Sequence, residues 1–130
     1  MQHTENFDLN IIETSDAFGP EALNENTRKL DTVLAEMPFA VFGSYKGDGK
    51  SYQLIDLGFK PKAVLVFRRD GVTTISGNPC SGLALAGSPV TLGGITHAVE
   101  ISNIGFYVYY SSTNSYANYN GYTYNYIAFR

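Results

Sequence analysis

The chain has 130 residues, of which 44% are hydrophobic, and it carries a net charge of −3 and a single cysteine. This length predicts one folded domain with a short appendage. The single cysteine excludes an internal disulfide framework, the acidic balance argues against nucleic-acid binding, and no apolar run approaches the roughly 20 residues that span a bilayer.

The charge is unevenly distributed along the chain. Residues 1–38 hold eight acidic and two basic side chains, whereas residues 39–130 hold four acidic and seven basic ones. This difference predicts two parts with different roles: a lead-in with a helical neck over 1–38, and a head domain over 39–130. Within the head, Lys60, Lys62 and Arg68 would share one strand face, which we interpret as a solvated cationic patch.

The first part predicts an extended segment over residues 1–14 and then one helix from about residue 20 to residue 36. Pro20 suits the first helical position, and Glu21 complements the positive end of the helix dipole. Pro38 ends the helix, because the residue before a proline avoids helical geometry.

The apolar residues of this helix have a heptad spacing, with alternating steps of four and three residues. This spacing predicts an oligomer interface in the form of a short helical neck. The alternative is an amphipathic helix packed on its own domain. The residues of this predicted seam are Leu23, Thr27, Leu30, Leu34 and Met37.

From residue 39 onward the pattern is that of β-strands separated by Gly, Asn, Asp and Pro turns. Many short strands without a second helix favour a small antiparallel sandwich or barrel. We predict a mainly β fold, an antiparallel jelly-roll-like β-sandwich preceded by one N-terminal α-helix. Asp70-Gly71 is typical of a two-residue hairpin turn. The expected strands are 39–45, 51–57, 62–68, 72–75, 83–86, 89–92, 97–102, 104–110 and 122–129.

The residue types of common catalytic and metal sites form no recognisable pattern in the sequence. The two histidines, His3 and His97, and the one cysteine, Cys80, have no zinc-ligand spacing. We expect His97 to be structural and Cys80 to be a small buried residue. Asp48 and Asp70 lie in turn sequences, where aspartate bonds its own backbone. We therefore predict no catalytic residues, no metal site, no cofactor and no enzymatic activity.

The C-terminal part is rich in tyrosine and nearly free of charge. Eight of the ten tyrosines fall in the last 24 residues, and residues 71–130 contain only two charged side chains, Glu100 and Arg130. Tyrosine offers a large rigid contact area with a polar tip, and the interleaved Asn and Ser offer adaptable hydrogen bonds. This composition favours a recognition surface for sugars or protein loops.

Two sets of motifs carry a family resemblance. The first is TSDAFGPEALNEN at 14–26, followed by KLD at 29–31; the second is GSYKGDG at 43–49, LGFKPKAVLVF at 57–67 and YNYIAFR at 124–130. The first resembles an opening found in phage and prophage tail proteins. The second resembles C-terminal head domains of tail-fibre, receptor-binding and minor structural proteins of tailed phages.

The resemblance implies a component of the virion tail, a homotrimer that joins other tail proteins and contacts the host surface at its tip. We expect it to be made in the host cytoplasm without a signal peptide and not to insert into a membrane. The continuous apolar run Ala63–Phe67 is typical of a strand covered on both faces. The motif residues therefore form scaffold, and ligand contacts are expected in segments 76–97 and 110–122.

The leading hypothesis is a non-catalytic receptor-binding head that contacts a host cell-surface glycan or protein. Its predicted ligand-binding residues lie on one loop that we expect to be mobile: Tyr116, Asn118, Tyr119, Asn120 and Tyr122. One alternative is a purely structural tail or baseplate assembly protein, because tyrosine is also enriched at subunit interfaces. Another is a carbohydrate-binding module.

Overall fold

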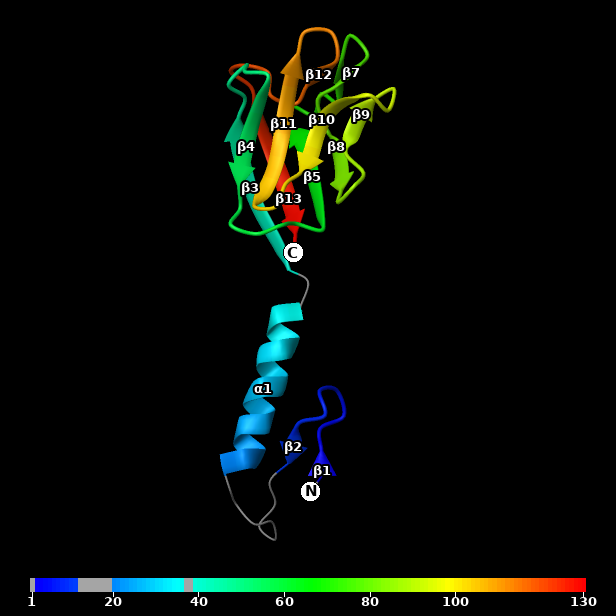
Figure 1. Cartoon of the computed structure of the whole chain (residues 1–130). Coiled ribbons are helices and arrows are strands. Elements are labelled where there is room, and N and C mark those ends of the chain that lie inside the picture. The colour runs from blue at the N-terminus through cyan, green and yellow to red at the C-terminus, as the bar shows by residue number, and fades with distance from the viewer. Residues whose placement is uncertain (1, 12–19, 37–38) are drawn as a thin grey trace. The chain divides into compact units, whose positions relative to one another are not determined.

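The computed structural model describes residues 2–11, 20–36 and 39–130 (Figure 1). The chain divides into two compact units, Met1–Met37 and Pro38–Arg130. The division lies one residue from the boundary that the charge distribution predicts.

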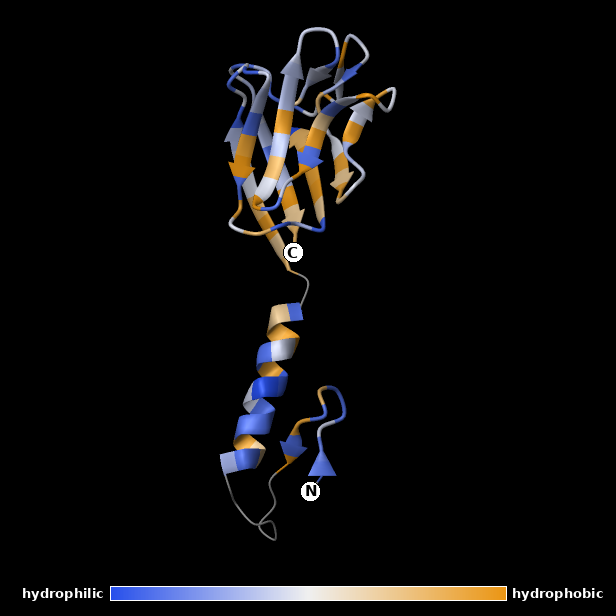
Figure 2. Cartoon of the chain, viewed as in Figure 1, coloured by the Kyte–Doolittle hydropathy of each residue, from blue (hydrophilic) through white to orange (hydrophobic). Residues whose placement is uncertain are grey.

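The N-terminal unit consists of a small hairpin and one helix. Strands β1 (Gln2–His3) and β2 (Asn10–Ile11) pair antiparallel, and helix α1 spans Pro20–Glu36. The predicted helix bounds are confirmed. Residues 2–11 do not form a single extended segment, because the chain reverses at Asp8, which has a φ of 52°. Figure 2 shows hydrophobic and hydrophilic residues alternating along α1.

The C-terminal unit is built from two antiparallel sheets. The first sheet has the order β3-β13-β5-β8, and the second has the order β12-β11-β10-β9 with β4 also paired to β11. The strands of the first sheet are β3 (Ala40–Lys46), β13 (Thr123–Phe129), β5 (Ala63–Arg68) and β8 (Gly82–Leu85). Those of the second are β4 (Tyr52–Asp56), β9 (Val90–Leu92), β10 (Thr96–Ile101), β11 (Gly105–Ser111) and β12 (Ser115–Tyr116).

The strand pairing confirms the mainly β, jelly-roll-like sandwich. The first strand of the unit, β3, pairs with the last, β13, and β4 pairs with β11 from near the other end of the chain. Strands from the two ends of the sequence are therefore neighbours in both sheets. Strand pairing in the middle of the chain is between sequence neighbours, because β9, β10 and β11 are consecutive both in the sequence and in the sheet.

The core lies between the two sheets and takes side chains from both. Val64, Val66 and Tyr124 come from the first sheet, Phe106 and Val108 come from the second, and all five are buried. The alternate residues of each strand point away from this core, as the period of a β-strand requires.

Cys80 is buried and has no disulfide partner, as predicted. Desolvation raises the pKa of its thiol. This is the environment of a structural cysteine, because an activated thiol has a lowered pKa.

The Asp70-Gly71 hairpin prediction is wrong. The chain does turn there, with the Gly71 amide donating to the Arg68 carbonyl. However, β5 pairs with β13 and β8, whereas β6 (Thr74–Ile75) pairs with β7 (Asn78–Pro79). The local Asp70-Gly71 signal correctly predicted a chain reversal. The strand partners of β5 are set instead by its apolar pairing with the distant strands β13 and β8. The two-residue strands β7 and β12 were not predicted.

Candidate recognition surfaces

The predicted ligand loop brings three of its tyrosines together with Tyr110. The Tyr119 ring stacks on Tyr110 at 5.3 Å and on Tyr122 at 5.2 Å between centroids. Tyr116 meets Tyr119 edge-on at 5.1 Å. We call Tyr110, Tyr116, Tyr119 and Tyr122 the tyrosine row. Its outer end is the most open, because Tyr122 is 40% exposed and neighbouring Asn120 is exposed, whereas the other three rings are half-buried.

Two core tyrosines hold the backbone of this loop. Tyr45 and Tyr124 stack with centroids 4.9 Å apart. The Tyr45 hydroxyl donates to the Ala117 carbonyl at 2.6 Å, and the Tyr124 hydroxyl donates to the Tyr116 carbonyl and accepts from the Tyr119 amide. Burial raises the pKa of Tyr124 to about 12. The loop is thus anchored to the sheet, in contrast to the expectation of a mobile segment.

Asn118 is fully buried, which corrects its prediction as a ligand contact. Its side-chain amide donates to the Asp48 carboxylate at 2.7 Å and to the Lys50 carbonyl at 3.0 Å. Asp48 also accepts from the Lys50 amide, as expected of aspartate in a turn. Asn118 therefore joins the loop to the Gly47–Lys50 turn, a contact that no local sequence signal indicates.

Arg68 lies beneath the outer end of the tyrosine row. Its guanidinium is 4.0 Å from the Tyr122 ring centroid and pairs with both carboxylate oxygens of Asp70. The hydrogen bond from Arg68 lowers the pKa of Asp70 to about 2. Arg68 is only 7% exposed, so the prediction of a solvated cationic patch is wrong for this residue. The Arg68 side chain lies on the same inner face of β5 as Val64 and Val66, because residues two apart on a strand point the same way.

The outer face of the second sheet carries a group of residues that the ligand-site prediction missed. Tyr109 donates to Glu100 Oε2 at 3.1 Å, and His97 Nδ1 contacts the same oxygen. Tyr107 lies beside Tyr109, with ring centroids 6.3 Å apart, and 5.9 Å from Tyr52. Partial burial, followed by the charge of Glu100, raises the pKa of Tyr109 to about 12. We call His97, Glu100, Tyr52, Tyr107 and Tyr109 the sheet-face cluster.

One sequence signal could have located part of this cluster. Tyr107 and Tyr109 are two residues apart on a predicted strand, so they share a face. His97 and Glu100 are three residues apart, which places them on opposite faces of a regular strand. A register shift between His97 and Val99 breaks the alternation in β10. Nothing in the sequence indicates this bulge.

The outer face of the first sheet is apolar. Phe42, Ile127, Leu65 and Leu83 are direct cross-strand neighbours on β3, β13, β5 and β8. Phe42 is 73% exposed and Leu83 is 55% exposed. The sequence predicted that the strand Ala63–Phe67 is covered on both faces. That prediction is wrong, because the residues that the structure describes cover only the inner face of this strand. The apolar face consists of Phe42, Leu65, Phe67, Leu83, Leu85, Ile127 and Phe129.

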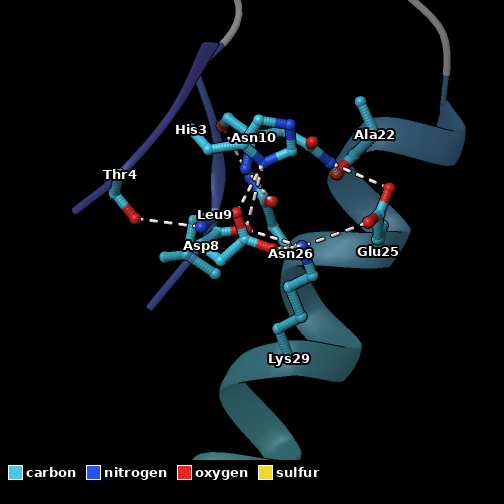
Figure 3. Close-up of polar contacts among 9 residues, drawn as sticks. All are labelled: His3, Thr4, Asp8, Leu9, Asn10, Ala22, Glu25, Asn26 and Lys29. Carbon is cyan, nitrogen blue, oxygen red and sulfur yellow. Dashed lines mark hydrogen bonds and ion pairs between the residues drawn. The ribbon is translucent and has the colours of Figure 1, made fainter. Parts of the chain in front are cut away.

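The predicted helical seam lies beside the face that the N-terminal hairpin contacts. The partly buried helix residues are Ala22, Asn26, Lys29 and Val33, whereas Leu23, Thr27, Leu30 and Leu34 are exposed. Asn10 of the hairpin bonds Asn26 and Ala22 of the first group, and also the exposed Glu25 (Figure 3). The Thr27 hydroxyl donates to the Leu23 carbonyl at 2.9 Å, so it is satisfied within the helix. Met37 lies outside the described residues.

The ranges that the structure describes contain no group of three or more His, Cys, Asp or Glu side chains arranged to hold a metal ion. Within the same ranges, no helix combines the length and hydropathy needed to cross a membrane. Comparisons with protein-family models, curated proteins and solved structures give no match for this chain.

Proposed function

We propose that this chain is a non-catalytic receptor-binding or tail-fibre head of a tailed phage, which contacts a host cell-surface glycan or protein. The observation that carries the proposal is the tyrosine row, in which Tyr110, Tyr119 and Tyr122 stack and Tyr116 meets Tyr119 edge-on. The row ends at exposed Tyr122, beside exposed Asn120 on the anchored loop. A rigid aromatic surface loses little conformational entropy on binding. The motif resemblance supports the assignment to a virion tail.

Self-association belongs to the same proposal. The stripe of Leu23, Thr27, Leu30 and Leu34 has heptad spacing and lies beside the hairpin contact. Three copies joined at this stripe would form the neck of a homotrimer and present three heads to one cell, which strengthens weak binding by avidity. Other tail proteins would hold the assembly on the virion.

Host-cell adsorption tests the proposal directly. The labelled intact protein is mixed with a panel of bacterial strains, and cell-bound signal is compared for the native chain and the double variant Tyr122→Ala/Asn120→Ala. We expect at least one strain to bind the native protein and lose about tenfold or more of the signal with the variant. A Ser112→Ala variant, at another exposed loop position, serves as the control. Absence of binding to every strain of the candidate hosts would contradict the proposal.

A purely structural assembly role is the second candidate, and the apolar face favours it. Contiguous exposed apolar side chains on one sheet mark a protein contact more often than a free surface. The discriminating variant is Phe42→Ser/Leu83→Ser. If recognition is the role, this variant keeps host-cell adsorption. If assembly is the only role, the native protein shows no adsorption, and the variant fails to incorporate into particles.

A further inference from the structure

The sheet-face cluster is held together by an irregularity in the fold. The register shift between His97 and Val99 turns His97 toward Glu100, although their separation of three residues would place them on opposite faces of a regular strand. β-Bulges commonly re-aim a side chain next to a functional site. The bulge thus creates a contact between a ring nitrogen and a carboxylate on the open face of the sheet.

Two contacts orient the carboxylate of Glu100, which still has positions free to accept further hydrogen bonds. His97 and the Tyr109 hydroxyl both contact Oε2. An ionised carboxylate has about four lone-pair sites on its two oxygens, so Glu100 retains sites for donors from a ligand. The Glu100 side chain is 36% exposed, and its cross-strand neighbour is Tyr107.

Two aromatic rings, Tyr52 and Tyr109, lie close to Tyr107 on this face. The Tyr107 ring is tilted by 48° to Tyr109 and meets Tyr52 edge-on, at 80°. Tyr52 is 60% exposed. Rings of this kind offer apolar faces with polar tips at little conformational cost.

A hollow of about 390 Å³ adjoins the cluster at His97 and Tyr109. Hydroxyl groups are prominent in its wall, from Ser51, Thr96 and Ser111, and the described residues that line it include no Lys, Arg, Asp or Glu. The described surroundings of the Glu100 carboxylate therefore supply hydrogen-bonding groups but no Lys or Arg side chain to pair with an anionic ligand.

We propose that the sheet-face cluster is a binding site for a neutral glycan, distinct from the tyrosine row. The inference rests on the proposed recognition function and names its ligand class. Sugar hydroxyls donate to the free positions of Glu100, and a sugar ring packs against Tyr107 and Tyr52. An anionic sugar is disfavoured, because Glu100 repels it and the described residues of the adjoining wall include no Lys or Arg side chain.

The test is binding of the intact protein to an array of immobilised neutral and anionic oligosaccharides. We expect binding to neutral members, little changed by added salt because no ion pair forms. Tyr107→Ala and Glu100→Gln should each weaken it about tenfold. Tyr109→Phe keeps the ring but removes the hydroxyl that holds Glu100, and should cause a smaller loss. Phe42→Ala, on the other sheet, should bind like the native protein.

The outcomes separate this inference from the broader function. The inference is overturned if the native protein binds only anionic sugars on the array or binds no sugar at all. It is also overturned if the Tyr107 and Glu100 variants bind neutral sugars as the native protein does. Host-cell adsorption that requires Tyr122 but not Glu100 would uphold the proposed function and overturn the second site. Thermal unfolding of each variant excludes misfolding as the cause of a loss, and a folded Glu100→Gln protein with weakened binding supports the site.

Discussion

Asn26 of the helix pairs its side-chain amide with the backbone of Asn10, as a neighbouring strand would. Its Oδ1 accepts from the Asn10 amide at 2.7 Å, and its Nδ2 donates to the Asn10 carbonyl at 3.0 Å (Figure 3). One side chain therefore satisfies both polar backbone groups of a β2 residue. This contact helps to hold the hairpin on one face of the helix, and the adjacent leucine stripe is exposed within the N-terminal unit.

Asn26→Ala should release the hairpin from the helix. It removes two hydrogen bonds, each contributing about 0.5–1.5 kcal/mol. Hydrogen exchange of the residue 2–11 amides measures the release, and we expect faster exchange there without a change in the β-sandwich. Asn24→Ala, at an exposed position of the same helix, is the matched control. Equal protection of residues 2–11 in Asn26→Ala and the native chain would show that other contacts hold the hairpin.

The Arg68–Asp70 pair predicts a loss of stability in acid. The folded-state pKa of Asp70 is about 2, below its ordinary value of 3.8. Folding therefore favours the ionised carboxylate, so the contribution is fully present above about pH 4 and is lost as pH falls through about 2. Thermal unfolding across this range should show a smaller acid-induced fall in Tm for Asp70→Asn than for the native protein. Asp31→Asn, on the helix, should keep the native profile.

Gly47→Ala should disrupt the loop of the tyrosine row. A Cβ at Gly47 would lie 2.1 Å from the Tyr119 carbonyl oxygen, so the loop backbone must shift. Overpacking of this kind costs about 1–3 kcal/mol. Gly71→Ala provides the comparison, because its φ of +80° is strained for alanine but its Cβ meets no atom within 4 Å. We expect Gly47→Ala alone to weaken host-cell adsorption, and a Gly47 variant with native adsorption would contradict this role.

Tyr45→Phe should loosen the same loop from below. It keeps the ring that stacks on Tyr124 but leaves the Ala117 carbonyl without its hydroxyl donor, at a cost of about 1–3 kcal/mol. Chemical denaturation measures the loss. Tyr52→Phe removes a hydroxyl from a residue that is 60% exposed and should change stability little. Similar midpoints for both variants would argue against an anchoring role for Tyr45.

Alkaline unfolding should follow the ionisation of buried tyrosine. Burial raises the folded-state pKa of Tyr124 from 10.0 to about 12, so folding favours the neutral phenol. Its contribution to stability is present below about pH 10 and is lost as pH rises through about 12. Tyrosinate absorbance followed together with circular dichroism should show Tyr124 ionising with the loss of structure. Ionisation of Tyr124 in a protein that keeps its native circular dichroism would contradict this coupling.

Local patterns predicted the elements of this chain well, and their partners less well. The helix over Pro20–Glu36 follows from proline placement and periodic leucines, both of which act within a few residues. The Asp70-Gly71 turn was also recognisable, but its hairpin was not formed. Pairing depends on which distant strand offers a matching apolar row, and β13 meets that condition for β5.

The candidate surfaces divide in the same way. Composition by itself determined that tyrosine, asparagine and serine, rather than charge, would dominate the C-terminal surface, and strand parity determined that Tyr107 and Tyr109 would share a face. Only the tertiary structure decided that Asn118 is buried by a contact 70 residues away, and that a bulge turns His97 toward Glu100. Burial and register arise from packing between distant segments, so they are properties of the assembled sheets rather than of any local run of residues.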